Sequence, residues 1–536
     1  MTDKFNYWLE NIDEKDELKA MSEEDRKESF YKDLDFGTGG LRGVIGLGTN
    51  RMNKYTVRKT TQGLAEEIKS HGSDFMKKGV VIAYDSRNKS AEFADEAARV
   101  LCANGIKTYI FDSLRPTPVL SFAVRYLGCA RGIVITASHN PKKYNGYKIY
   151  GEDGGQLPPS ATDMMIKFIE NIDIFKDVKT GENTAEVIAE PVDSAYTDAV
   201  YAQRMNVRIP EDFKVVYTPI HGSGNIPVRR ILKKIGAENV FVVKEQELPD
   251  GNFPTVNVPN PENKDVFDLA IELAKKENAD IIIGTDPDSD RIGVVVKDSE
   301  GKYFVLNGNQ TGTLLAEFIL RNQNPMPKNP KIVKTIVTTD MVESVANAYG
   351  VKVDNVLTGF KFIGEKIKEY EKSGDTYIFG LEESYGYLKG TYARDKDAVV
   401  AAMLTVQMAA DYKMQGKTLY DGLCDLYKKY GCYRQELISL TYEGIDGSEK
   451  IAAIMKKLRE NPPEYAEKVL DYSKGIDSLP KSNVIKLMLN DGWMVARPSG
   501  TEPKIKIYIE IAAKSVDDAQ KRIDELKKIF MDEYVG

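Results

Sequence analysis

The stretch GIVITASHNPKKYNGYK, residues 132–148, carries an apolar strand into a polar turn. Gly132 to Ile135 has the composition of a buried strand. Asn140-Pro141 marks its end, because the residue before a proline is disfavoured in helical conformation. We therefore expect the turn to present the hydroxyl of Ser138 rather than to bury it. Asn145-Gly146 is a strong hairpin signal, and a turn there would fold Lys148 back towards Ser138; an ordinary surface turn is the alternative.

The chain is too long for one hydrophobic core. Its 536 residues predict three or four domains. Hydrophobic residues make up 42% and charged residues 29%, values typical of a soluble globular protein without extended disorder. The net charge of -7 disfavours nucleic acid as a partner but permits a locally basic pocket for a small anion.

Neither a disulfide framework nor a zinc site is indicated. The cysteines, Cys102, Cys129, Cys424 and Cys432, lack CxxC spacing and companion histidines, so we expect reduced, buried thiols. Residues 1–19 are rich in Asp, Glu and Lys, and no stretch of the chain approaches the length of a membrane span. We therefore expect a cytoplasmic protein with no membrane partner, and the sequence indicates no obligate protein partner.

Three segments of the chain repeat the order strand, helix, strand, helix, strand. The first has strands at 80–84 and 107–111 and one ending at Ser138, with helices at 91–104 and 118–127. The second has strands at 213–217, 240–243 and 281–283, with helices at 226–235 and 265–276. The third has strands at 332–337, 353–357 and 377–379, with helices at 341–348 and 363–372. Each unit predicts a parallel sheet with helices on its faces. Because ligands bind beyond the carboxyl ends of such strands, we expect the loops after the last strands to meet in one cleft.

The pattern changes in the C-terminal part of the chain. After helices at 398–413 and 419–430, strands are predicted at 436–442, 484–489, 493–496 and 505–511, followed by an amphipathic helix at 516–531. The predicted fold class is therefore α/β: three similar βαβαβ domains with mixed or parallel sheets, plus a smaller C-terminal α+β domain, around one central cleft. The predicted domains are 1–207, which includes charged N-terminal helices, 208–310, 311–432 and 433–536.

Two loops offer groups for an anion and for a cation. In FGTGGLRG, residues 36–43, glycines allow close backbone approach and Arg42 offers a planar fork for phosphate, although the dinucleotide spacing GxGxxG is absent. Asp286, Asp288 and Asp290 alternate in a loop, a hard-oxygen set that suits Mg²⁺. An EF-hand is excluded, because it would need Gly and Glu where this chain has Arg291 and Lys297. Acidic caps on a surface turn are the alternative.

The stretch RPSGTEPKIK, residues 497–506, offers the donors that a phosphate dianion requires. They are the side chains of Arg497, Ser499, Thr501, Lys504 and Lys506, with Gly500 allowing close approach. Glu382 and Ser384 pair an acceptor with a donor, a combination suited to the hydroxyls of a sugar. Lys361, which follows Thr358-Gly359, and Lys396 can add positive charge. A bare turn and an exposed helix surface are the respective alternatives.

Four loops, TASHNPKKYNGYK, GTDPDSDR, GLEESYG and RPSGTEPK, resemble in this order the active-site loops of the α-D-phosphohexomutase superfamily, found in phosphoglucomutases and phosphomannomutases. The FGTGGLRG, TPIHGSG and NGYKIYGEDGGQ stretches are most similar to those of the bacterial phosphoglucomutases. The resemblance implies a resting enzyme phosphorylated on Ser138, with Mg²⁺ held by Asp286, Asp288, Asp290 and an oxygen of the phosphoserine. It places His139 and Lys148 against the reacting phosphate. We add Arg42 to this catalytic set, and Arg291, Thr358 and Gly359 to the substrate-binding set.

The implied activity interconverts glucose 1-phosphate and glucose 6-phosphate through glucose 1,6-bisphosphate, which is both intermediate and activator. In this scheme Glu382 and Ser384 grip the sugar hydroxyls, and the non-reacting phosphate is held by Arg497, Ser499, Thr501 and Lys504 or Lys506. Phosphomannomutase or phosphopentomutase activity, synthesis of glucose 1,6-bisphosphate, and non-enzymatic sensing of sugar phosphates are the alternatives. Many relatives carry a histidine where this chain has Gly386, which leaves Lys148 and Lys396 as candidate proton acceptors.

Overall fold

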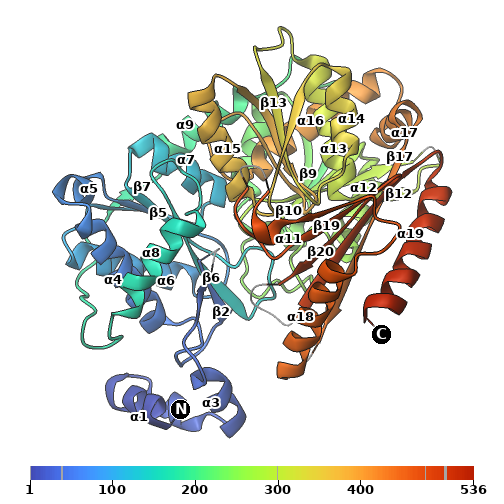
Figure 1. The fold of residues 1–536 in the computed structure, drawn as a ribbon. Coiled ribbons are helices and arrows are strands. Elements are labelled where there is room, and N and C mark those ends of the chain that lie inside the picture. The colour runs from blue at the N-terminus through green and yellow to red at the C-terminus, as the bar shows by residue number, and fades with distance from the viewer. Residues whose placement is uncertain are drawn as a thin grey trace.

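The computed structural model describes residues 2–37, 40–298, 300–442, 444–476, 479–499 and 504–535. Within these residues the strands form four sheets, each covered by helices (Figure 1). Their strand orders are β1-β2-β6-β5-β3-β4-β7, β12-β11-β10-β8-β9, β14-β13-β15-β16 and β17-β21-β20-β19-β18.

The first sheet belongs to the N-terminal part of the chain. Its strands are β1 (Phe36–Gly37), β2 (Gly40–Val44), β3 (Val80–Tyr84), β4 (Thr108–Phe111), β5 (Arg131–Ile135), β6 (Tyr144–Tyr150) and β7 (Glu186–Ile188). The helices of this part are α4 (Lys54–Ser70), α5 (Ser73–Lys78), α6 (Ser90–Ala103), α7 (Thr117–Leu127), α8 (Pro159–Glu170) and α9 (Glu190–Tyr201). Strand β3 is parallel to β4 and β5, whereas β6 is antiparallel to β5 and β2.

The charged N-terminal segment forms three short helices at one edge of this domain, at the bottom of Figure 1. They are α1 (Thr2–Asn11), α2 (Lys15–Ala20) and α3 (Glu23–Phe30). Trp8 packs edge-on against Phe30 and Tyr55, with ring centroids 5.6 and 5.5 Å away. Because Tyr55 lies on α4, this aromatic cluster anchors the segment to the domain.

The second and third sheets follow in chain order. The second contains β8 (Lys214–Thr218), β9 (Asn239–Val242), β10 (Ile281–Thr285), β11 (Ile292–Lys297) and β12 (Tyr303–Leu306), with α10 (Asn225–Lys234), α11 (Lys244–Glu247), the 3₁₀ helix η1 (Lys264–Phe267) and α12 (Asp268–Glu277). The third contains β13 (Pro330–Thr335), β14 (Lys352–Val356), β15 (Thr376–Glu382) and β16 (Gly386–Lys389), with α13 (Gly308–Asn322), α14 (Met341–Ala348), α15 (Phe360–Ser373), α16 (Ala398–Met414) and α17 (Leu419–Tyr430).

The fourth sheet is antiparallel throughout the described residues. It contains β17 (Cys432–Thr441), β18 (Lys468–Asp471), β19 (Ile485–Leu489), β20 (Gly492–Pro498) and β21 (Lys504–Ala513), with α18 (Gly444–Glu460), η2 (Tyr472–Lys474), α19 (Val516–Phe530) and η3 (Met531–Val535). Helix α18 was not predicted from the sequence, whereas α19 begins at the predicted residue. Among the described helices, none combines the length and the apolar content needed to cross a bilayer.

The first three sheets share one plan, which confirms the predicted α/β fold class. In each, the last strand of the βαβαβ unit lies beside the first, and the first beside the second. Each last strand then continues into an antiparallel neighbour, giving the pairs β5–β6, β10–β11 and β15–β16. The loops that join these pairs follow the carboxyl ends of the last strands.

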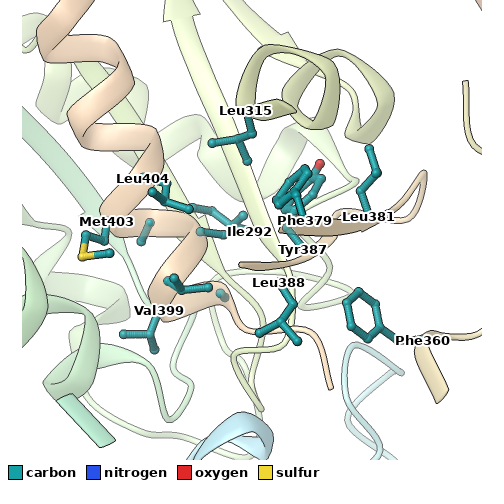
Figure 2. Packing of buried hydrophobic residues seen from close by; sticks show 14 of the residues in the cluster. Ile292, Leu315, Phe360, Phe379, Leu381, Tyr387, Leu388, Val399, Met403 and Leu404 are labelled. Carbon is teal, nitrogen blue, oxygen red and sulfur yellow. The ribbon is translucent and has the colours of Figure 1, made fainter. Parts of the chain in front are cut away.

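Helix α16 lies between the second and third sheets and is buried on nearly every side. It packs against α10 and β10 of one sheet's domain and against β16 and α13 of the other. Figure 2 shows Val399, Met403 and Leu404 of α16 among the apolar side chains of both domains, including Ile292 and Leu388. A helix that is apolar all round is typical of a protein interior, so α16 joins the two domains through a shared core.

The hairpin between β5 and β6 turns at residues 138–143, so the turn predicted at Asn145-Gly146 is wrong. Gly146 lies inside β6, where a Cβ atom would stand 2.6 Å from the Thr136 carbonyl oxygen and 2.7 Å from that of Leu41. Glycine is required there because the strands approach closely. Strand β5 likewise ends at Ile135 and does not reach Ser138, whose backbone is left-handed with φ 51°.

We expect Gly146→Ala to destabilise the protein by about 1–3 kcal/mol, the usual cost of overpacking a filled interior. The strands on both sides of β6 would have to separate, and thermal unfolding would show a lower midpoint. Gly181→Ala is the matched control, because a Cβ atom at Gly181 would meet its nearest neighbour at 3.6 Å. Equal midpoints for the two variants would contradict this account of Gly146.

Candidate active site

Each of the three loops at the ends of β5, β10 and β15 contains a non-glycine residue with a left-handed backbone. These are Ser138 (φ 51°), Ser289 (φ 50°) and Tyr385 (φ 68°). Such a conformation costs about 1–3 kcal/mol and persists only where surrounding contacts hold it. Backbone strain of this kind gathers at functional sites, and here it recurs at equivalent places in three domains.

Ser138 lies on the first loop with its hydroxyl directed at the second. Its Oγ donates to Asp286 Oδ2 at 3.0 Å and lies 3.2 Å from His139 Nδ1. Burial lowers the pKa of His139 well below its usual value, and Arg291 and Arg42 lower it further, so the imidazole is neutral. A hydroxyl between a carboxylate and a neutral imidazole has acceptors for its proton, as a nucleophile requires.

Asp286, Asp288 and Asp290 lie on the second loop, between β10 and β11, and are fully buried. A ligand oxygen from each lies within 4.8 Å of the others. Burial and mutual repulsion raise the pKa of Asp286 and of Asp290. Burial would also raise the pKa of Asp288, but Lys148 and the Thr117 hydroxyl lower it below its usual value. Oδ1 of Asp288 and Oδ1 of Asp290 are buried and have no hydrogen-bond partner among the described residues. The arrangement suits a hard metal cation.

Three cations surround the aspartates, one from each of the first three domains. Lys148 Nζ lies 3.2 Å from Asp288 Oδ2, and Lys396 Nζ lies 3.2 Å from Asp290 Oδ2. Arg291 Nε lies 3.9 Å from Asp290 Oδ1, and the same guanidinium forms an ion pair with Glu262. Lys396 also fills the space beside Gly386, where a Cβ atom would meet its Cδ at 2.3 Å. Lys396 therefore occupies the place that a larger side chain at 386 would take.

The third loop and its surroundings carry the predicted sugar contacts. Glu382 Oε1 accepts from the main-chain N–H of Gly359 at 2.9 Å, and Glu382 Oε2 lies 3.9 Å from Lys396 Nζ. Burial raises the pKa of Glu382 to about 7, although the positive charge of Lys396 acts to lower it. Burial lowers the pKa of Lys361.

Most of the predicted site residues face one cavity of about 970 Å³ to which all four sheet domains contribute. They are Arg42, His139, Lys148, Asp290, Arg291, Thr358, Gly359, Lys361, Glu382, Ser384, Lys396, Arg497 and Lys506. Asp286, Asp288 and Ser138 are buried and do not line the cavity. The expectation that the turn presents the Ser138 hydroxyl rather than burying it is therefore wrong, because the left-handed turn directs that hydroxyl inward to Asp286. Among the described residues, Ser499 and Lys504 do not line it; the Ser499 N–H donates to the Lys504 carbonyl oxygen at 2.7 Å. Gly500 and Thr501 lie outside the described residues.

Sequence reasoning did not assign a role to several residues that contact the predicted site. Thr117 donates to Asp288 Oδ2 at 2.8 Å, and Glu262 lines the cavity. Asp85 and Arg87 reach the Ser138 loop from the end of β3. The sequence did contain a signal for Asp85 and Arg87. Both follow an apolar strand at its carboxyl end, which is where α/β sheets bind their ligands.

Comparison with known proteins agrees with this geometry. Family models for phosphoglucomutase/phosphomannomutase alpha/beta/alpha domains I, II and III match residues 33–175, 194–301 and 307–430, and the model for the C-terminal domain matches residues 446–528. A phosphoglucomutase of Staphylococcus aureus (strain USA300) is 38% identical over 544 residues, covering 97% of each chain.

Two solved structures share the fold. A phosphoglucomutase/phosphomannomutase family protein of Burkholderia thailandensis has a TM-score of 0.70 at 22% identity, with 94% of this chain and 97% of that chain covered. Parafusin (phosphoglucomutase) of Paramecium, in an open form, has a TM-score of 0.70 at 19% identity, with 94% and 95% covered. On the match of all four domains and of full-length relatives, the chain belongs to the phosphoglucomutase/phosphomannomutase family.

Proposed function

We propose that this protein is a phosphoglucomutase, which interconverts glucose 1-phosphate and glucose 6-phosphate through a phosphorylated Ser138. The observation that carries the proposal is the position of the Ser138 hydroxyl, 3.0 Å from Asp286 in a buried cluster of three carboxylates. The full-length similarity to curated phosphoglucomutases supports glucose as the sugar.

Mg²⁺ is the cation that this site would hold. Asp286, Asp288 and Asp290 supply hard oxygen ligands, and the unpartnered oxygens of the last two are available to a metal. When bound, Mg²⁺ supplies Lewis-acid stabilisation of the charge on the transferring phosphoryl group.

The residues of the chain divide the remaining tasks. In one transfer the bond from phosphorus to the Ser138 oxygen breaks and phosphorus joins the free hydroxyl oxygen of the bound glucose phosphate, giving glucose 1,6-bisphosphate. In the other, the second phosphoryl group returns to Ser138. Arg42, His139 and Lys148 line the cavity, and in this scheme they would face the reacting phosphate and offset charge that develops during transfer.

Glu382 would take the proton of the sugar hydroxyl, and Lys396 beside it would stay a cation. Burial would lower the pKa of Lys396, but Asp290 and Glu382 raise it above its usual value, while the pKa of Glu382 is raised to about 7. Glu382 can therefore retain a proton in one transfer and return it in the other, while Lys396 Nζ, 3.9 Å from Glu382 Oε2, stays protonated and offsets negative charge.

Substrate binding would use the rest of the cavity. Arg497 and Lys506, with Ser499, Thr501 and Lys504 nearby in the chain, would hold the non-reacting phosphate. Burial lowers the pKa of Lys506, and the positive charges of Arg497 and Lys504 lower it further, so a bound phosphate would relieve this repulsion. Glu382 and Ser384 would contact hydroxyls, and Arg291, Thr358, Gly359 and Lys361 would complete the substrate contacts.

The deciding experiment compares turnover of glucose 1-phosphate, mannose 1-phosphate and ribose 1-phosphate with Mg²⁺ and a trace of the matching bisphosphate. We expect the highest kcat/KM for glucose 1-phosphate, and loss of turnover with retained ligand binding in Ser138→Ala. If mannose 1-phosphate or ribose 1-phosphate gave the highest kcat/KM, that sugar phosphate would replace glucose 1-phosphate as the proposed substrate. Stoichiometric consumption of a phosphoryl donor would instead indicate bisphosphate synthesis, and unchanged turnover in Ser138→Ala would refute the nucleophile.

We expect Asp290→Asn to raise the thermal midpoint of the metal-free protein by about 2–4 °C, because it removes one of three crowded buried charges. The same variant should lose the stabilisation that Mg²⁺ gives the wild type. Asp280→Asn, at the opposite end of β10, is the control that keeps the Mg²⁺ response. Equal responses of the two variants would show that the metal binds elsewhere.

The raised pKa values of Asp286 and Asp290 also fix the sign of the pH dependence. The folded, metal-free protein retains protons that the unfolded chain releases, so its stability decreases as pH rises above the ordinary carboxylate pKa. Cation binding must displace these protons. Calorimetry of Mg²⁺ binding near pH 6, in buffers of different ionisation enthalpy, should therefore show proton release, whereas identical heats in all buffers would contradict it.

We expect Lys396→Ala to lower kcat by about 10²–10³-fold, the usual cost of removing one donor that stabilises charge at the reacting centre, and small primary amines, which are cations at neutral pH, to restore part of the rate. The cavity is large enough to admit such amines. Lys389→Ala is the control: burial lowers the pKa of Lys389 to about 8, but this lysine lies on β16 outside the cavity lining. Rescue of Lys148→Ala but not of Lys396→Ala would assign this stabilising charge to Lys148 instead.

A further inference from the structure

The loop that follows β3 holds the turn that carries Ser138. Arg87 in this loop has a side chain with 0% exposure. Its guanidinium donates to the main-chain carbonyl oxygens of Ser138, Asn140, Pro141 and Tyr144. The distances from Nη1 to the last two are 3.1 Å, and Nε lies 3.1 Å from the Ser138 oxygen. One planar group therefore binds the whole turn from beginning to end.

Asp85 completes this support through the N–H of Ser138. The Thr136 hydroxyl donates to Asp85 Oδ2 at 2.6 Å, and its oxygen accepts from the Ser138 N–H at 2.7 Å. Asp85 Oδ1 accepts from Ser90 Oγ at 2.7 Å and from the Arg87 N–H at 2.9 Å. Both main-chain polar groups of Ser138 thus depend on Asp85 and Arg87.

The same loop also contacts the domain that carries the aspartates. The Arg87 guanidinium lies 5.2 Å from the centre of the Phe253 ring. Asn88 Nδ2 donates to the Gly251 carbonyl oxygen at 3.3 Å and to Asn252 Oδ1 at 3.1 Å. The β3 loop therefore sets the Ser138 turn in a defined place relative to the second domain.

The geometry points to Arg87 as a positioning residue for phosphoryl transfer at Ser138, with Asp85 as its partner; this inference rests on the proposed function of Ser138. Ser138 is held at a left-handed φ of 51°, which a free turn would not keep. Release of its carbonyl oxygen would let the backbone relax and would rotate Oγ away from Asp286. Arg87 does not line the cavity, so it acts through the turn and not by contact with substrate.

The test compares Arg87→Met with Arg131→Met. Arg131 is buried in the same domain, pairs with Glu67, and lies at the start of β5, away from the turn. We expect Arg87→Met to lower kcat by about 100-fold with KM within about threefold of wild type, as a misplaced reacting group does. Arg131→Met should lower the thermal midpoint and leave kcat within about threefold of wild type. Arg87→Lys keeps the charge but not the planar fork, so its kcat should decrease by at least about tenfold.

Two controls separate this inference from the proposed function. Wild-type protein incubated with glucose 1,6-bisphosphate should carry phosphate on Ser138, as peptide mass spectrometry can establish. Turnover without that phosphate would refute the proposed function. Two results would overturn the positioning role while leaving the proposed function intact, provided that the wild type is phosphorylated. One is a kcat for both Arg87 variants near that of Arg131→Met. The other is a raised KM with unchanged kcat in the Arg87 variants. If Arg87→Met does not fold, Arg87→Lys and Asp85→Asn provide the same comparison.

Discussion

Three carboxyl groups crowded into the interior at the end of β10 are the constraint on which the rest of the site depends. Each buried charge needs partners, because removing it from water costs several kcal/mol. The partners come from other domains: Lys148 from the first and Lys396 from the third. Thr117 from the first domain adds a hydrogen bond to Asp288. The need to offset these charges therefore joins the first three domains at one point, where chemistry can take place.

The same arrangement of strand, loop and antiparallel strand, repeated in three domains, brings three different chemical groups to that point. In each βαβαβ domain the last strand ends in a loop with a left-handed residue and returns as an antiparallel strand. The first loop presents the Ser138 hydroxyl, the second the aspartates, and the third Glu382 with Ser384. The shared geometry explains why domains with little sequence in common place their polar loops around one cavity, since each loop follows the carboxyl end of an equivalent strand.

Apolar packing and polar bonds together join the four domains. Helix α16 gives the second and third domains a common apolar core, and Tyr150, Ser121 and Tyr196 of the first domain bind the segment 394–397 just before it. The fourth domain meets the third through apolar packing as well, because Trp493, Val495 and Tyr508 belong to the same buried cluster as α16, and polar bonds add to this contact. Lys486 donates to the Ile336 carbonyl oxygen at 2.9 Å, and the Asp340 N–H donates to Glu510 at 2.8 Å.

The sequence by itself determined the fold class and the chemistry of the loops. These features are local, so they can be read without knowledge of the fold. They are the alternation of apolar strands and helices, the spacing of Asp286, Asp288 and Asp290, and the turn at Asn140-Pro141. What only the tertiary structure decided were contacts between distant segments. Gly146 indicated a turn locally but serves close strand approach, and Lys396 occupies the space beside Gly386. Arg87, 51 residues before Ser138, supports it through main-chain carbonyl groups. Such contacts carry no sequence pattern, because a carbonyl oxygen is present at every residue and only packing selects which ones a distant guanidinium reaches.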